Sequence, residues 1–377
     1  MVWTEKQRHI IEFALASLSR RPGKNLAVLV VYTSVVFILS SILFFTNSLK
    51  KEASLVLQGA PEIVVQRIVA GRHDLMTEDY IRSLGRLPGV REARGRLWGY
   101  YYEPLVGANL TLVVPPGERQ GAGGIAVGQG VARSLKARKG DFLTLKAFDG
   151  SYINLGVSDV FSPESELVSA DLIEISGQDF RRLFNVKKGY FTDITLRVAN
   201  SKEVGTVAAK IRFLFPDTRP VTRGEILRTY DAIFDWRGGL LAIIFSGAVL
   251  AFTIFAWEKG ASMGSEEKRE IGVLKAIGWE TSDILAMKSW EGAVISLSSF
   301  LLGVTFAYIH VFFGSYVLFE PVLKGWSVLY PVFHLIPHVD PYQLLALFFL
   351  TVAPYTVATI IPSWKAAIVD PDQVMRL

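Results

Sequence analysis

Four long stretches of the chain carry apolar side chains almost without interruption. They are residues 25–49, 238–257, 292–319 and 341–364, and none contains Asp, Glu, Lys or Arg. An α-helix rises about 1.5 Å per residue, so about 20 residues cross the ~30 Å hydrocarbon core of a bilayer. The pattern predicts an α-helical membrane protein with four transmembrane helices, the second of which we extend to 236–257.

The unequal spacing of these helices predicts the rest of the organisation. A segment of residues 1–24 precedes the first, and a large domain, 50–235, separates the first from the second. The remaining connections, 258–291 and 320–340, are short, and a tail of 365–377 follows the last helix. The cytoplasmic ends of membrane helices are enriched in Lys and Arg. Such residues occur at five positions in 1–24 and five in 258–291, whereas 320–340 has only Lys324. We therefore expect both termini in the cytoplasm and 50–235 outside the inner membrane.

Composition removes several classes of function. The chain has no cysteine, which excludes disulfides and cysteine metal sites. Its net charge of +5 is spread over many charged side chains, a balance that gives no argument for nucleic acid. No Gly-Lys-Ser/Thr phosphate loop and no Gly-x-Ser-x-Gly elbow occurs, so the chain is not predicted to be an enzyme.

The first segment is predicted to hold an amphipathic helix over 4–20. Apolar side chains recur there at three- and four-residue spacing. Two interpretations fit equally well: a helix lying on the inner membrane surface, and a helix packed on the protein's own membrane helices.

The domain 50–235 is predicted to be α/β, with two lobes. The first lobe combines strands at 63–69, 90–102 and 105–114 with a helix that begins after Thr77. The second opens at 124–127 and contains a helix near 130–137 and a hairpin turning at Asp149-Gly150. Further helices fit 178–184 and 203–215, and another is expected from Gly224 into the second membrane helix.

A few polar side chains invite a chemical role. The glycines within 121–130 fit turns better than a phosphate loop. His334 and His338 are four residues apart, but prolines bracket them, and a pair that binds nothing is favoured over a metal site. His310 lies inside a predicted membrane helix, where an ionisable side chain is a candidate for a functional role. An imidazole that is only hydrogen-bonded to a neighbouring helix is the commoner outcome. No metal or cofactor is assigned to the chain.

The connection 258–291 contains the most informative motif. Ser265 is predicted to cap a short helix that ends at Gly278, with Ile271, Leu274 and Ile277 or Gly278 along one face. Thr281 is expected to cap the next helix. A short amphipathic helix of this kind suits a groove in a partner protein.

The sequence Glu270-Ile271-Gly272-Val273-Leu274-Lys275-Ala276-Ile277-Gly278-Trp279, with Gly303 beyond it, resembles the signature of the MacB/FtsX/LolC-type permeases of ABC transporters. The tail beginning at Pro362-Ser363-Trp364 is similar to that family's as well. The resemblance implies a MacB-like periplasmic core for 50–235 and a dimer of two identical or related permeases. It also implies a separate ATPase that binds ATP and Mg²⁺. A coupling helix would contact this ATPase through Arg269, Glu270, Ile271, Gly272, Val273, Leu274, Lys275, Ala276, Ile277 and Gly278.

The function implied is that of a permease subunit which couples ATP hydrolysis to movement of its outer domain. It would export or extract a hydrophobic or lipidated substrate: a lipoprotein, lipid, peptide or drug. The alternative is a transmembrane signalling or scaffold protein that activates an outer partner such as a cell-wall hydrolase. The predicted membrane helices carry no internal acid or base, so neither function involves an ion pathway through them.

Overall fold

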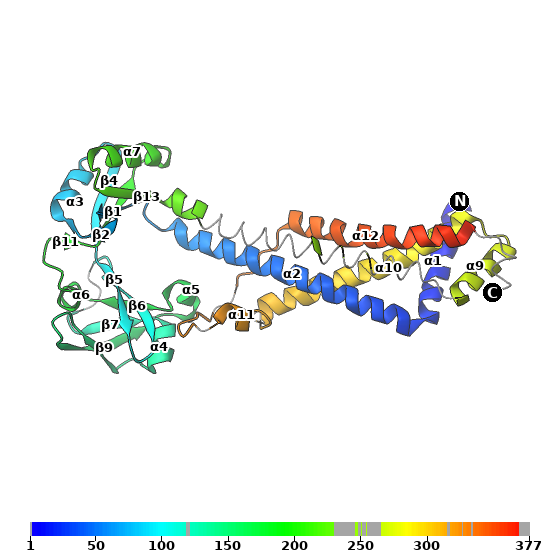
Figure 1. The fold of residues 1–377 in the computed structure, drawn as a ribbon, viewed down its shortest axis with the longest axis horizontal. Helices are drawn as coiled ribbons and strands as arrows, with labels where there is room; N and C mark the ends of the chain where they lie inside the picture. Colours follow the sequence, from blue (N-terminus) through cyan, green and yellow to red (C-terminus); the bar gives the residue numbers. More distant parts are fainter. Residues whose placement is uncertain are drawn as a thin grey trace. The chain divides into compact units, whose positions relative to one another are not determined.

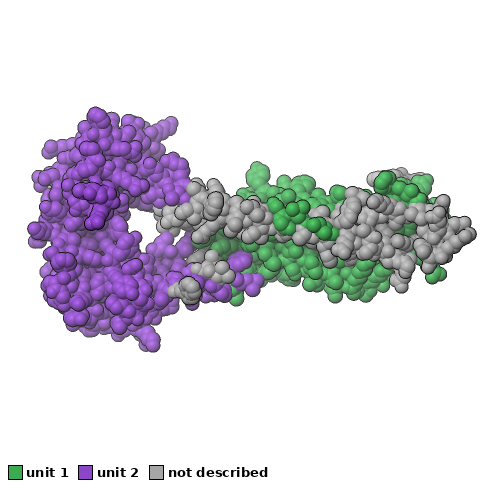
Figure 2. Space-filling view, viewed as in Figure 1, with its two compact units in different colours: residues 1–50, 234–317, 335–377 green, residues 51–233, 318–334 purple. Residues whose placement is uncertain are grey.

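The computed structural model describes residues 2–117, 121–229, 246–247, 250, 254, 265–314, 317–325, 327–332 and 335–368. The chain divides into two compact units, coloured in Figure 2. Unit 1 comprises 1–50, 234–317 and 335–377, and unit 2 comprises 51–233 and 318–334.

Unit 1 is helical (Figure 1). Its elements are α1 (Val2–Arg20), α2 (Pro22–Gln58, which runs on into unit 2), α9 (Ser265–Ala276), α10 (Thr281–Tyr308) with a π-helical end η3 (Ile309–Phe313), and α12 (Pro341–Ile368). The break between α1 and α2 is the single residue Arg21, and Pro22 opens α2, since proline suits a first helical turn. α10 begins at Thr281 with Glu280 as its N-cap, so the expected cap at Thr281 is wrong by one residue.

Two helical stretches are long and apolar enough to cross a membrane, Pro22–Glu52 and Thr281–Phe313. A shorter apolar stretch, Pro341–Val357, lies within α12. Nearly all of the predicted second membrane helix, 236–257, lies outside the described residues. α2 continues well past the predicted end at residue 49, because nothing after Leu49 breaks a helix. Its 37 residues correspond to a rod of about 55 Å, longer than a bilayer core.

The long helices of unit 1 pack around an apolar core. Tyr32 and Val36 of α2, Ile295 and Phe300 of α10, and Tyr355 of α12 are all buried in it. Gly303 lets α10 approach α2 closely, because a Cβ at this position would lie 2.7 Å from Val36. Small residues commonly permit such close contacts between membrane helices.

Unit 2 contains two α/β lobes. The first is a sheet in the order β13-β1-β12-β4, with β2 paired to β1. Its strands are β1 (Ile63–Val69), β2 (Arg72–Asp74), β4 (Val90–Arg96), β12 (Asp193–Val198) and β13 (Thr218–Thr222). The helices α3 (Glu78–Gly85) and α7 (Val204–Leu214) contribute Leu84, Val207 and Ile211 to the apolar core of this lobe.

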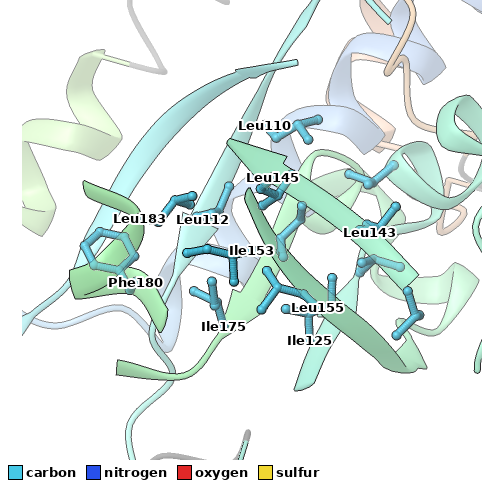
Figure 3. Close-up of a cluster of buried hydrophobic side chains, with 14 of the residues drawn as sticks. Leu110, Leu112, Ile125, Leu143, Leu145, Ile153, Leu155, Ile175, Phe180 and Leu183 are labelled. Atoms are coloured by element: carbon cyan, nitrogen blue, oxygen red, sulfur yellow. The ribbon is translucent and has the colours of Figure 1, made fainter. Parts of the chain in front are cut away.

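The second lobe is a six-stranded sheet in the order β5-β6-β10-β7-β9-β8. Its strands are β5 (Trp98–Glu103), β6 (Ala108–Val113), β7 (Gly124–Val127), β8 (Phe142–Lys146), β9 (Tyr152–Val160) and β10 (Leu172–Ile175). Helices α4 (Gln129–Leu135), α5 (Glu166–Ser169) and α6 (Gly177–Phe184) accompany it, with a 3-10 turn η1 (Pro163–Ser165) before α5. Figure 3 shows the apolar side chains of its core, among them Leu112, Ile125, Leu155, Ile175 and Phe180.

The second lobe is an insertion within the first, which corrects the predicted order of the two lobes. The predicted strand 90–102 divides at Leu97, so that β4 joins the first sheet and β5 the second. The strand predicted at 105–114 also belongs to the second lobe. The chain returns through β11 (Tyr190–Phe191), which pairs with β3 (Met76–Thr77), and completes the first sheet with β12 and β13. The order of strands along the chain does not predict the lobe of each strand, because strand pairing depends on packing between residues far apart in the sequence.

Candidate functional site

The predicted coupling helix is present as α9, a twelve-residue helix joined to α10 by a tight turn. Gly278 has φ +102°, a left-handed conformation that favours glycine and ends the helix, as predicted. The amide of Trp279 donates to the carbonyl of Leu274 at 3.0 Å and closes the turn.

One face of α9 is buried within unit 1. Leu274 is 4% exposed and packs with Ile10 and Ala14 of α1 and Met287 of α10. Ile271 contacts Ile284 at the start of α10. The ring of Trp279 covers these contacts, with its centroid 5.3 Å from that of Phe13.

Ion pairs fix α1 at the edges of the same contact. Glu270 of α9 pairs with Arg20 at 2.5 Å and Arg21 at 3.0 Å. Lys6 pairs with Asp283 of α10 at 2.7 Å, and this hydrogen bond raises the pKa of Lys6. Of the two interpretations of the N-terminal helix, packing on the protein's own helices is therefore confirmed.

The opposite face of α9 is exposed within unit 1. It carries Val273, 48% exposed, Ile277, 69% exposed, and the exposed residues Arg269, Ala276 and Gly278. The ten predicted contact residues thus divide into two groups. Ile271, Gly272 and Leu274 are buried, and Glu270 and Lys275 are half-buried. The predicted face that joined Ile277 to Ile271 and Leu274 is wrong. The sequence pattern could not show that α1 and α10 bury Ile271 and Leu274 and leave Ile277 exposed.

A second polar cluster lies where the two lobes of unit 2 join. The carboxylate of Asp193, fully buried, accepts two hydrogen bonds from Arg96 at 2.8 and 2.6 Å and one from the indole of Trp98 at 2.9 Å. Thr192 hydroxyl bonds with both the amide and the carbonyl of Trp98. A buried carboxylate needs such partners, and here they tie together the two chain segments that connect the lobes.

The connection between the predicted third and fourth membrane helices also contributes to unit 2. It includes α11 (Glu320–Lys324) and a segment, 327–332, that contacts the second lobe. Glu166, 3% exposed, accepts hydrogen bonds from the amide of Val332 at 2.8 Å and pairs with Arg133 at 2.5 Å. Arg133 also donates to the carbonyl of Tyr330 at 3.1 Å, and Leu329 packs against the core of the lobe. The sequence analysis missed this docking, since no pattern in 320–340 signals a contact with residues about 160–200 positions earlier.

The other polar candidates do not form a chemical site among the described residues. Gly128 and Gly130 have backbone contacts with Ala170, and the α4 amide of Val131 donates to the Ala170 carbonyl, which leaves this glycine segment as a packed turn. His310 Nδ1 lies 3.3 Å from the hydroxyl of Ser41, a partner on a neighbouring helix. His334 lies outside the described residues. No cluster of three His, Asp or Glu side chains suited to a metal occurs in the described part of the chain.

Comparison with known proteins finds a family match for the C-terminal third of the chain. Residues 238–371 match the model of the family described as FtsX-like permease C-terminal. No curated protein sequence matches the chain significantly.

Two solved structures are similar to part of the chain. One is the extracellular domain of the noncanonic ABC-type transporter YknZ from Gram-positive bacteria, at 11% identity and a TM-score of 0.30. It covers 42% of this chain and 99% of its own. The other is the periplasmic region of MacB from Actinobacillus actinomycetemcomitans, at 10% identity and a TM-score of 0.30. The match covers 45% of this chain and 92% of the MacB chain. The segment 238–371, which contains α9, α10 and α12, is therefore similar to the C-terminal part of FtsX-like permeases.

Proposed function

We propose that this chain is a permease subunit that couples ATP hydrolysis by a separate ATPase to movement of its α/β domain, and so exports or extracts a hydrophobic or lipidated substrate. The observation that carries the proposal is the two-sided α9. One face is fixed to α1 and α10 by buried apolar contacts and ion pairs, and the other presents Val273 and Ile277. An apolar face on a braced helix is suited to receive force from a partner.

The topology in this proposal has four membrane helices, with both termini and α9 in the cytoplasm and the α/β domain outside. ATP and Mg²⁺ bind to the partner ATPase. Two permease chains, identical or related, work together. The distribution of Lys and Arg around the predicted membrane helices supports this orientation.

The connections of unit 2 support a mechanical route from α9 to the two lobes. α2 is continuous to Gln58, and β1 of the first lobe begins at Ile63. The connection between α10 and α12 is instead docked on the second lobe through Glu166 and Arg133. The first pair of membrane helices would therefore move the first lobe, and the second pair would move the second lobe. A shift between the pairs would change the angle between the lobes at the Asp193 cluster.

Substitutions on the exposed face of α9 test the proposal. We expect Val273→Glu with Ile277→Glu to abolish copurification with the ATPase and permease-dependent ATP turnover, because two buried interface charges would lack partners. Leu15→Glu is the matched control, since Leu15 is 48% exposed on α1 and should leave both measurements unchanged. Leu274 is unsuitable as a probe because its substitution would disturb the packing of α1. Complex formation and ATP turnover that survive the double substitution would refute the assignment of α9.

Two further measurements separate the remaining parts of the proposal. Reporter fusions at residue 150 and at the C-terminus test the topology, and a cytoplasmic residue 150 would refute it. An assay of substrate release from liposomes that contain the permease and its ATPase tests transport. Intact ATP turnover and lobe movement without release of any hydrophobic cargo would favour activation of an outer partner instead.

A further inference from the structure

A basic pocket opens on the first lobe of unit 2. Its volume is about 760 Å³, and three elements line it: the end of α7, strand β13 and the helix over 223–229. Each contributes one arginine, Arg212, Arg219 and Arg228 respectively. The volume falls within the range of about 300–1,000 Å³ that is usual for small-molecule sites.

The positive charge of this pocket is not balanced by the described residues around it. Arg212, Arg219 and Arg228 have no ion pair or hydrogen bond with any side chain in the described part of the chain. Glu225, the acid that lines the pocket, accepts from the amide of Thr222 at 2.9 Å, while its own amide donates to the Thr222 hydroxyl at 3.1 Å. This reciprocal cap occupies the carboxylate at the start of the helix.

Some other arginines of the same lobe are paired with acids. Arg67 contacts Asp217, Arg96 contacts Asp193, and Arg223 contacts Glu62. Among the described residues, the three pocket arginines have no such carboxylate, and they line one pocket together. Like charges that converge on one cavity repel each other, and a bound anion removes this cost.

The pocket also has an apolar side. Val221 and Ile226 line it. Apolar side chains that line the same pocket as unpaired guanidinium groups fit a ligand that is anionic at one end and apolar at the other. Arginine's planar fork matches the oxygens of a phosphate group.

We propose that this pocket binds the phosphate group of an anionic lipid, with the start of the acyl chains against Val221 and Ile226. The proposed topology strengthens the choice of a lipid, because Arg228 lies eight residues before the predicted membrane helix at 236. The binding of a phosphate group by the three arginines does not depend on the ATPase or on α9.

The test uses the full chain in phosphatidylglycerol vesicles that contain a phosphatidylglycerol analogue with a photoreactive acyl chain. Crosslinked peptides are mapped by mass spectrometry. We expect labelling at residues 212–229, and a loss of at least about tenfold in a variant that combines Arg212→Gln, Arg219→Gln and Arg228→Gln. Losing even one of the three charge-assisted contacts corresponds to about tenfold. The matched control combines Arg72→Gln, Arg86→Gln and Arg91→Gln, three exposed arginines of the same lobe, and should label like the unmodified chain.

Two additional labelling experiments identify the molecule that carries the phosphate group. A photoreactive phosphatidylcholine should label weakly, and inorganic phosphate should compete with the anionic lipid only at high concentration. Strong competition by phosphate without lipid labelling would overturn the lipid assignment in favour of a soluble phosphate compound. Equal losses in the two triple variants, or equal labelling by phosphatidylcholine, would overturn the site itself. Val273→Glu should leave labelling unchanged, so failure here is distinct from failure of the ATPase-coupling proposal.

Discussion

Replacing Glu166 by alanine should release residues 327–332 from the second lobe. The carboxylate is 3% exposed and accepts a hydrogen bond from the Val332 amide of this segment at 2.8 Å. It also pairs, within the lobe, with Arg133, which donates to the Tyr330 carbonyl of the segment at 3.1 Å. A hydrogen bond to a charged group contributes about 1.5–3 kcal/mol.

The expected loss of docking free energy is therefore about 1.5–3 kcal/mol, the contribution of the one lost bond to Val332. The contact of Leu329 and the bonds to the carbonyls of Val328 and Tyr330 remain. The loss equals a rise of about 10- to 150-fold in the undocked fraction. Hydrogen–deuterium exchange of the full chain measures it directly, as faster exchange in the peptide containing 327–332.

Glu164→Ala is the control, because Glu164 is exposed and two residues away in the 3-10 turn η1. It should leave exchange at 327–332 unchanged. If Glu166→Ala also leaves this exchange unchanged, the bond between Glu166 and Val332 does not hold the segment on the second lobe. The proposed mechanical route would then not depend on Glu166. If docking is lost but ATP-driven movement of the second lobe persists, the mechanical route itself is wrong.

Three other substitutions test further contacts. Gly95→Ala would place a Cβ 2.4 Å from the ring of Phe191, and should lower the unfolding free energy by about 1–3 kcal/mol in thermal or chemical denaturation; an unchanged stability would show that the ring moves freely. Arg20→Gln with Arg21→Gln should reduce ATPase coupling by less than about 30-fold while complex formation persists, because two partly exposed ion pairs contribute about 0–1 kcal/mol each; complete loss of the complex would contradict this. Hydrogen bonds from Tyr80 and Arg67 lower the pKa of Asp217, so this carboxylate stabilises the first lobe above its unfolded pKa near 3.8 and loses that effect as the pH falls through the folded value. The melting temperatures of the unmodified chain and Asp217→Asn should therefore differ at pH 7 and converge in acid, and a constant difference would refute the assignment.

Local patterns predicted the helices of this protein well. The amphipathic spacing of residues 4–20 gave α1, and the charge-free stretch 25–49 lies in α2. The stretch 292–319 begins in α10 and continues through η3, beyond the end of α10 at Tyr308. Gly278 correctly marked the turn after α9. Each of these features depends on residues within a few positions of one another, so the sequence contains the necessary information.

The partners of these elements depended on tertiary structure. The sequence placed Ile277 on the same face as Leu274, but α1 covers Leu274 and leaves Ile277 exposed. The sequence also placed the strand 90–102 in one lobe, but this segment passes from the first lobe to the second. The buried Asp193, nearly a hundred residues later, fixes the crossing by accepting hydrogen bonds from Arg96 and Trp98.

What the sequence by itself determined is thus the set of helices, the existence of a large α/β domain and the motif of α9. Hydrophobic periodicity and helix-ending residues are local properties, which a single chain segment fixes. The insertion of one lobe into the other, the docking of 327–332 on Glu166 and the convergence of three arginines on one pocket were decided only by the tertiary structure. Each joins segments far apart in the chain, and which segments meet follows from the packing of whole sheets and helices.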